Sequence, residues 1–177
     1  MSVRKMVNRD AIGAAAMQLV EKSGVEALSM RSLANALGIK APSLYDHVKS
    51  RDEVLALVQA EGLRQFGMRF SQAGQSTREK VLFYRTWALN NSKLYPVVFQ
   101  QTLHRELLPQ GLEESCLGLV VEAAGGSHIA ARVMWAQLHG LVDLELQGRL
   151  PVDADLDKTW GQVVIAIDAL KRASPNS

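Results

Sequence analysis

The sequence has a single cysteine and no long apolar run, and each of these features excludes some classes of protein. Cys116 has no second cysteine with which to form a disulfide, which favours a reducing compartment. No apolar segment approaches the length that crosses a bilayer, and the start of the chain lacks the hydrophobic stretch of a secretory signal peptide. These features predict a cytoplasmic protein that makes no contact with a membrane.

Motifs that typify enzymes are also missing. The sequence contains no glycine-rich phosphate loop, no Gly-x-Ser-x-Gly elbow and no His/Cys spacing typical of a metal site. The four histidines, at positions 47, 104, 128 and 139, are scattered, and no two of them lie four residues apart. We therefore predict no catalytic residue, no metal and no cofactor, with an enzyme as the competing class.

Composition and charge point towards a helical protein with a basic amino-terminal end. Apolar residues make up 47% of the 177 residues, and Ala, Leu, Gln, Glu and Arg, which favour helices, are plentiful. The formal net charge is only +2, but residues 1–50 hold seven Lys/Arg against four Asp/Glu, whereas the remainder hold thirteen against fourteen. This excess of positive charge is a weak electrostatic sign of nucleic acid binding.

The most informative segment is Ser29–Arg51, in which two short helices are predicted on either side of a glycine turn. Ser29 is able to cap the first helix by accepting a hydrogen bond from an unpartnered backbone N–H. Gly38 suits the end of that helix, because glycine adopts the left-handed conformation without a Cβ penalty. Pro42 suits the first turn of the second helix, where its missing N–H costs nothing.

The second of these helices has a buried face and an exposed face. Leu44 and Val48, four residues apart, are predicted to point inward, which leaves a serine, a tyrosine and a histidine facing outward. Four basic residues surround that exposed face: Arg31, Lys40, Lys49 and Arg51. The arrangement is typical of a helix-turn-helix that lays its second helix in a DNA major groove, although an ordinary helical hairpin with a solvated face would show the same periodicity.

Several short runs between residues 9 and 58 form a more specific pattern. They are Lys22-Ser23-Gly24, Ser29-Met30-Arg31-Ser32-Leu33-Ala34, Leu37-Gly38-Ile39 and Pro42-Ser43-Leu44-Tyr45-Asp46-His47-Val48-Lys49-Ser50-Arg51-Asp52-Glu53. This pattern resembles the tetracycline-repressor-like (TetR) family of bacterial regulators. The resemblance implies an all-α homodimer with a small DNA-binding domain and a larger carboxyl-terminal domain, which dimerises and often holds a small effector.

The resemblance also implies roles for individual residues. Arg31 matches a position that reaches a base edge or a phosphate, and Arg51 matches a phosphate contact at the start of the fourth helix. Ala41 stands where relatives carry a polar base-reading residue, so the operator sequence is not inferred. The residues predicted to contact double-stranded DNA are Arg31, Lys40, Ala41, Pro42, Ser43, Tyr45, His47, Lys49 and Arg51.

The remaining patterns predict an all-α fold of about nine helices, because no hairpin turn signal separates alternating apolar runs. We expect a helix-turn-helix DNA-binding domain over residues 1–50 and a helical effector-binding and dimerisation domain over residues 51–177. Capping residues and breaks predict later helices over about 51–70, 77–93, 96–103, 112–124 and 128–147, with a ninth beginning near residue 157. Residues 2–8 are expected to be disordered in the free protein, with an arm that follows a DNA groove as the alternative, and residues 173–177 are expected to fray.

The last two long helices have the small and apolar residues expected of a dimer interface. The predicted interface comprises Val133, Ala136, Gln137, Gly140, Leu144, Trp160, Val163, Val164, Ile167 and Leu170. Burial within one chain would explain part of this stripe. A two-fold dimer would present two recognition helices to successive turns of an inverted-repeat operator.

The run Trp135-x-x-x-His139-Gly140 resembles the carboxyl-terminal domain of a TetR subgroup marked by Trp-x-x-x-His-Gly. Trp135, His139 and Asp143 step by four along one helix face, so they form either a pocket wall or an interior histidine held by a carboxylate beside a core tryptophan. Other pocket candidates, for each of which core packing is the alternative, are Phe66, Phe83, Trp87, Phe99, Leu103 and His104. Such a pocket would suit a small apolar or aromatic effector.

Together these patterns predict a DNA-binding transcriptional regulator. The expected form is a repressor that binds an inverted repeat as a homodimer until an effector tilts the fourth helix and separates the recognition helices. The alternative is a regulator of the same fold that binds no effector and is controlled by a partner protein.

Overall fold

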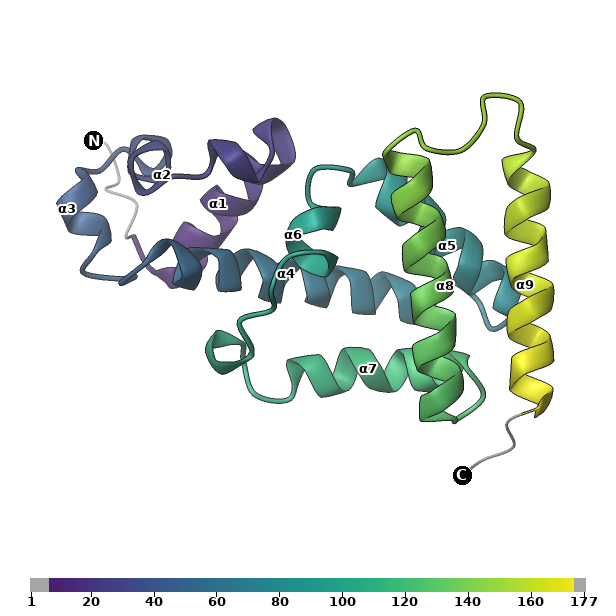
Figure 1. Cartoon of the computed structure of the whole chain (residues 1–177). Coiled ribbons are helices and arrows are strands. Elements are labelled where there is room, and N and C mark those ends of the chain that lie inside the picture. The colour runs from purple at the N-terminus through teal and green to yellow at the C-terminus, as the bar shows by residue number, and fades with distance from the viewer. Residues whose placement is uncertain (1–6, 174–177) are drawn as a thin grey trace. The chain divides into compact units, whose positions relative to one another are not determined.

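The computed structural model describes residues 7–173, which form nine α-helices, two short 3₁₀ turns and no strand (Figure 1). The predicted all-α fold is therefore confirmed. The helices belong to two compact units: the first comprises the chain up to Arg64 together with Lys93–Leu112, and the second comprises Gln65–Ser92 together with the chain from Glu113 onward. The expectations for residues 2–6 and 174–177 lie outside the described residues. Asn8, by contrast, caps the first helix by accepting from the Ala11 N–H at 2.8 Å, and Ala173 is the last residue of the ninth helix. None of the helices in residues 7–173 has the length and apolarity needed to span a bilayer.

The first unit contains the helix-turn-helix. Its elements are α1 (Arg9–Ser23), α2 (Met30–Leu37), α3 (Ala41–Leu44), the amino-terminal part of α4 (Arg51–Gln72), α6 (Tyr95–Phe99) and the 3₁₀ turns Val25–Ala27 and Arg105–Leu107. Ser29 caps α2 as predicted, since its hydroxyl accepts from the Ser32 N–H at 3.0 Å. Gly38 ends α2 in the left-handed conformation, with φ 69° and ψ 28°. These local signals fix the turn that separates α2 from α3.

Buried Gln59 of α4 fixes the segment that follows α6. Its amide nitrogen donates to the Val97 carbonyl at 3.1 Å and to the Thr102 carbonyl at 2.9 Å. Its amide oxygen accepts from the His104 N–H at 3.3 Å. Because Gln59 is fully buried, these three bonds satisfy polar groups that would otherwise be costly to remove from water.

Helix α6 is shorter than the predicted span of 96–103, and the Gln59 bonds account for part of the difference. The Val97 carbonyl, which would extend a helix, is bonded to Gln59, and the Gln101 N–H bonds to Pro96. Glycine at position 62 allows the close approach of α4 to this segment, since a Cβ there would lie 2.3 Å from a Val98 methyl carbon. The segment Val97–His104 is therefore held against α4 by hydrogen bonds and close packing.

The second unit is built from the remainder of α4 with α5 (Thr77–Asn90), α7 (Leu112–Ala123), α8 (His128–Leu146) and α9 (Leu156–Ala173). A capping box begins α5, with Ser76 and Glu79 bonded reciprocally at 2.9 and 3.2 Å. Asp155 caps α9 by accepting from the Lys158 N–H at 2.9 Å. Helix α5 packs against both α8 and α9, which also pack against each other.

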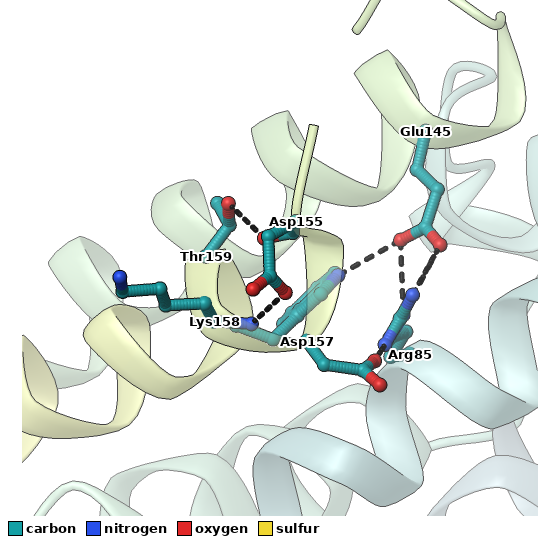
Figure 2. A network of polar contacts seen from close by, with 7 residues as sticks. Arg85, Glu145, Asp155, Asp157, Lys158 and Thr159 are labelled. Carbon is teal, nitrogen blue, oxygen red and sulfur yellow. Dashed lines mark hydrogen bonds and ion pairs between the residues drawn. The ribbon is translucent and has the colours of Figure 1, made fainter. Parts of the chain in front are cut away.

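A charged network holds α5, α8 and α9 together (Figure 2). Arg85 forms a bidentate pair with Glu145, with a shortest distance of 2.7 Å, and its other terminal nitrogen reaches Asp157 at 2.8 Å. The Trp160 indole N–H donates to the same Glu145 carboxylate at 2.8 Å. The hydrogen bonds to Glu145 raise the pKa of Arg85 further above its usual value, so its positive charge is permanent. The network therefore fixes the packing of three helices at one end of the unit.

We expect Gln59→Leu to lower the free energy of unfolding by about 1–3 kcal/mol, because the backbone groups bonded to Gln59 would lose their partner. Urea unfolding followed by circular dichroism measures this change. The control is Gln72→Leu at the exposed end of α4, which should change the stability by less than about 0.5 kcal/mol. Equal stability of Gln59→Leu and the unmodified protein would contradict the role given to this amide.

Candidate DNA interface and effector site

The predicted recognition helix is a single turn, α3, whose exposed face is set by two buried residues, one at its end and one in the turn that follows. Leu44 and Val48 are both 0% exposed, as predicted. Ser43 is exposed and Tyr45 is 53% exposed, whereas His47 is half-buried. Hydrogen bonds from the His47 and Val48 N–H groups to the Leu44 carbonyl, at 3.0 and 3.1 Å, continue the turn beyond the helix. The buried pair thus determines which side chains of this segment face solvent.

The other predicted contact residues lie on the same unit and are accessible. Arg31, Lys40, Pro42 and Lys49 are exposed, and Ala41 is half-buried. No residue of the predicted set is buried within the described structure. None of these predicted contact residues is therefore a core residue.

Arg51 has a structural role that its sequence pattern did not reveal. Its Nε donates to the Leu28 carbonyl at 2.9 Å, and its Nη2 donates to the Val25 carbonyl at 3.1 Å. These bonds join the start of α4 to the turn that precedes α2. The predicted phosphate contact would therefore be made by a guanidinium that already holds two backbone carbonyls.

A second arginine, Arg9 of α1, lies beside the turn that follows α3. Its Nη1 donates both to the His47 carbonyl and to Glu53 Oε2, each at 3.1 Å. The Glu53 carboxylate also accepts from the Lys49 N–H at 3.2 Å, and chiefly this bond lowers the pKa of Glu53 below its usual value of 4.5. The Ser50 hydroxyl caps α4 by accepting from the Glu53 N–H at 3.2 Å. Neither Arg9 nor Glu53 was among the predicted site residues.

Six of the predicted effector residues lie in the second unit, where four of them form an aromatic cluster. The Phe66 ring centroid lies 5.2 Å from that of Trp87, 5.8 Å from that of Phe83 and 6.3 Å from that of Trp135. Phe66 and Trp87 are buried, with 3% and 4% exposure, and Phe83 and Trp135 are half-buried. The two buried rings have the packing of core residues, which was the alternative stated for them.

His139 extends the polar side of this cluster. Its Nδ1 lies 2.9 Å from the Tyr84 hydroxyl. Its ring stacks on that of Trp135, with the two ring centroids 5.9 Å apart. The half-buried Asp143 lies one helical turn further along α8. Tyr84 was not predicted, because its contact with α8 joins residues 55 positions apart in the chain.

The remaining effector candidates, Phe99, Leu103 and His104, belong to the first unit and are half-buried. His104 Nδ1 lies 3.8 Å from the Glu106 carboxylate. In the second unit, a surface hollow of about 230 Å³ between α5 and α9 is lined by none of the predicted effector residues. Its lining residues are Arg78, Leu82, Asp157, Trp160, Gly161 and Val164.

The predicted dimer interface requires a correction at two positions. Trp160 and Ile167 are 1% and 0% exposed within a single chain, because this side of α9 packs against α5 and α8. They are therefore core residues of the second unit and not part of a surface. Of the other predicted residues, Val133, Ala136, Gln137, Gly140 and Leu144 are exposed, and Val163, Val164 and Leu170 are half-buried.

Two exposed apolar residues of α8 and α9 were not predicted. Ile129 of α8 and Ile165 of α9 are 63% and 58% exposed. Ile129 precedes Val133 by one helical turn, so the exposed apolar stripe of α8 is longer than predicted. We give one name, the α8–α9 face, to the exposed residues Ile129, Val133, Gly140 and Leu144 of α8 and Ile165 of α9.

Comparisons with known proteins agree with this architecture. An uncharacterized helix-turn-helix-type transcriptional regulator of Mycobacterium tuberculosis is 27% identical over 180 residues, covering 92% of this chain and 81% of the relative. A TetR transcriptional regulator from Rhodococcus sp. RHA1 has a similar fold, with a TM-score of 0.66 at 18% identity over 90% of this chain and 93% of that one. A TetR variant from Acinetobacter baumannii AYE in complex with minocycline gives a TM-score of 0.62 at 18% identity over 95% and 96% of the two chains.

Family models match both parts of the chain. Residues 12–58 match the model of bacterial regulatory proteins of the tetR family, and residues 78–167 match the tetracyclin repressor-like C-terminal domain. The narrower Trp-x-x-x-His-Gly subgroup stays a prediction. With more than half of its length matched by the second model, the chain belongs to the TetR family and is a DNA-binding transcriptional regulator with an amino-terminal helix-turn-helix.

Proposed function

We propose that this protein is a repressor that binds an inverted-repeat operator as a homodimer and is released by a small apolar or aromatic effector. The observation that carries the proposal is the surface around α3. Ser43 and Tyr45 face solvent there because Leu44 and Val48 are buried. The phenol ring and hydroxyl of Tyr45 and the hydroxyl of Ser43 suit contact with base edges and phosphates.

Positive charge supports DNA binding at this surface. Arg31, Lys40 and Lys49 are exposed around α3. Cations that neutralise phosphates release condensed counterions, so their contribution to affinity declines as salt is raised. The positive charges would position the domain, while outward side chains of α3 and Arg31 would read the sequence.

The α8–α9 face supports the homodimer. Its exposed isoleucine, valine and leucine side chains lie on two long helices, and Gly140 allows close approach of another helix. An interface of this kind is self-complementary about a two-fold axis and would form a four-helix bundle from two copies. Two recognition helices related by such an axis match an operator whose halves are inverted repeats.

The cluster around Phe66, Trp135 and His139 supports an effector site in the second unit. Aromatic rings offer edge-to-face contacts to an aromatic ligand, and the Tyr84–His139 pair offers polar atoms that would orient it. The solved TetR variant of similar fold binds minocycline, a small molecule. An effector causes release only if it binds the released conformation more tightly than the DNA-bound one.

Control by a partner protein is the second candidate, and the close packing of Phe66 and Trp87 favours it. A rise in melting temperature with small apolar or aromatic compounds would support the effector-controlled form. A melting temperature that responds to none of a broad set of such compounds would favour the partner-controlled form.

Selection of bound sequences from a pool of random duplex DNA tests the proposed function. We expect enrichment of an inverted repeat with half-sites about one helical turn apart. Recovery of no enriched sequence would contradict sequence-specific binding. Enrichment of a single half-site without its repeat would contradict the homodimeric form.

The Arg51 substitutions separate a phosphate contact from a structural role. Because Arg51 holds two backbone carbonyls, we expect both Arg51→Ala and Arg51→Lys to lower the free energy of unfolding by about 1–2 kcal/mol. A lysine keeps the charge but lacks the planar fork of donors. Suppose instead that Arg51→Lys is as stable as the unmodified protein and that DNA binding by Arg51→Ala depends less on salt. Arg51 would then act only as a phosphate contact and would have no structural role.

Charged substitutions on the α8–α9 face test the homodimer. We expect Val133→Asp combined with Ile165→Asp to shift the mass measured by analytical ultracentrifugation from a dimer to a monomer, because buried unpaired carboxylates oppose association. Val152→Asp is the matched control, since Val152 is fully exposed between α8 and α9. A dimer that withstands the double substitution would place the interface elsewhere.

A further inference from the structure

The turn between α3 and α4 is held from two sides by charged side chains. Arg9 approaches from α1 and donates to the His47 carbonyl, and Glu53 approaches from α4 and accepts from the Lys49 N–H. The two side chains are also bonded to each other at 3.1 Å. One ion pair therefore fixes the backbone on both sides of buried Val48, whose neighbours belong to the predicted DNA surface.

The bonds from the His47 and Val48 N–H groups to the Leu44 carbonyl keep the local shape of this turn, but they do not tie it to α1 or α4. Helix α3 is only four residues long, and its N-cap residue, Lys40, makes no side-chain capping bond. A helix of one turn has little stability of its own, so its position depends on tertiary contacts. Leu44 and Val48 anchor its inner side, but apolar contacts are non-directional and leave rotation about the buried pair weakly restrained. Directional hydrogen bonds to the backbone restrain that rotation.

The Glu53 carboxylate keeps its negative charge at neutral pH, so the Arg9–Glu53 ion pair persists there. The Glu53 side chain is only 16% exposed, and its bond from the Lys49 N–H lowers its pKa, so the carboxylate is ionised at neutral pH. Its stabilising effect is complete above the ordinary pKa of 4.5 and is lost as the pH falls through the lower folded value. Hydrogen bonds that involve charged groups are stronger than neutral ones.

We propose that Arg9 and Glu53 are positioning residues for DNA recognition, which hold the segment Tyr45–Lys49 in the orientation that a specific duplex requires. Arg9 lies outside residues 12–58 that the family model matches. The inference rests on the proposed contacts of Tyr45 and His47 with DNA. It assigns to Arg9 a bond to its own protein and not to a phosphate.

The test compares two duplexes of equal length: the sequence enriched by selection and an unrelated sequence. We expect Arg9→Gln and Glu53→Gln in the full chain each to weaken binding to the enriched duplex about tenfold. Binding to the unrelated duplex, and the dependence of affinity on salt, should stay unchanged, since no phosphate contact is removed. The double substitution should weaken binding little more than either single one, because both remove the same restraint.

Arg64→Gln is the matched control, because it removes an Arg–Glu pair within α4, with Glu61 at 3.0 Å, whose arginine is 51% exposed against 50% for Arg9. It should leave both affinities within about twofold, as expected for a surface ion pair. All binding is measured well below the melting midpoint of each variant, with the folded fraction determined by circular dichroism. Arg9→Lys, which retains a donor, should recover part of the affinity.

Three outcomes would overturn the proposal. Equal weakening on both duplexes, with a salt slope reduced by about one, would make Arg9 a phosphate contact. Weakening in proportion to the unfolded fraction would give the pair a purely structural role. Unchanged affinity for the enriched duplex would show that the turn keeps its orientation without the pair. Failure of the selection itself would instead contradict the proposed function, so the two failures are distinguishable.

Discussion

Burial of Leu44 and Val48 is the constraint on which the DNA-binding surface depends. Both side chains are fully removed from solvent. Leu44 ends a helix that is too short to maintain its own orientation, and Val48 lies in the turn that follows it. Their burial turns Ser43 and Tyr45 outward and brings the following turn to Arg9 and Glu53. Apolar packing thus selects the exposed face, while charge-assisted bonds to the backbone fix its angle.

Each of the two compact units is held by an inward-facing polar side chain with several partners: buried Gln59 in the first and half-buried Glu145 in the second. In the first unit the Gln59 amide ties Val97–His104 to α4, and in the second Glu145 joins Arg85 of α5 to Trp160 of α9. Each group is satisfied by several partners, as a buried polar group must be if it is to stabilise the fold. Such directional contacts specify one packing of helices among the many that apolar stripes alone would permit.

Local signals in the sequence were sufficient for most helix boundaries, but contacts between distant residues were not visible in it. Ser29 and Gly38 act within a few residues of their partners, so their roles were predictable from spacing. The bonds of Arg51 to Val25 and Leu28 cross more than 20 residues, and the pattern around Arg51 indicated only a helix start. Trp160 was assigned to the dimer because a helical stripe does not reveal whether it faces its own chain or another.

The three tyrosines allow a direct measurement of whether α3 is the surface that meets DNA. Tyr45 is 53% exposed, whereas Tyr84 and Tyr95 are fully buried. In a protein carrying isotope-labelled tyrosine rings, addition of the enriched duplex should shift and broaden the NMR signals of Tyr45 more than those of the two buried rings. Signals of Tyr45 that stay unchanged while the duplex is fully bound would contradict the account.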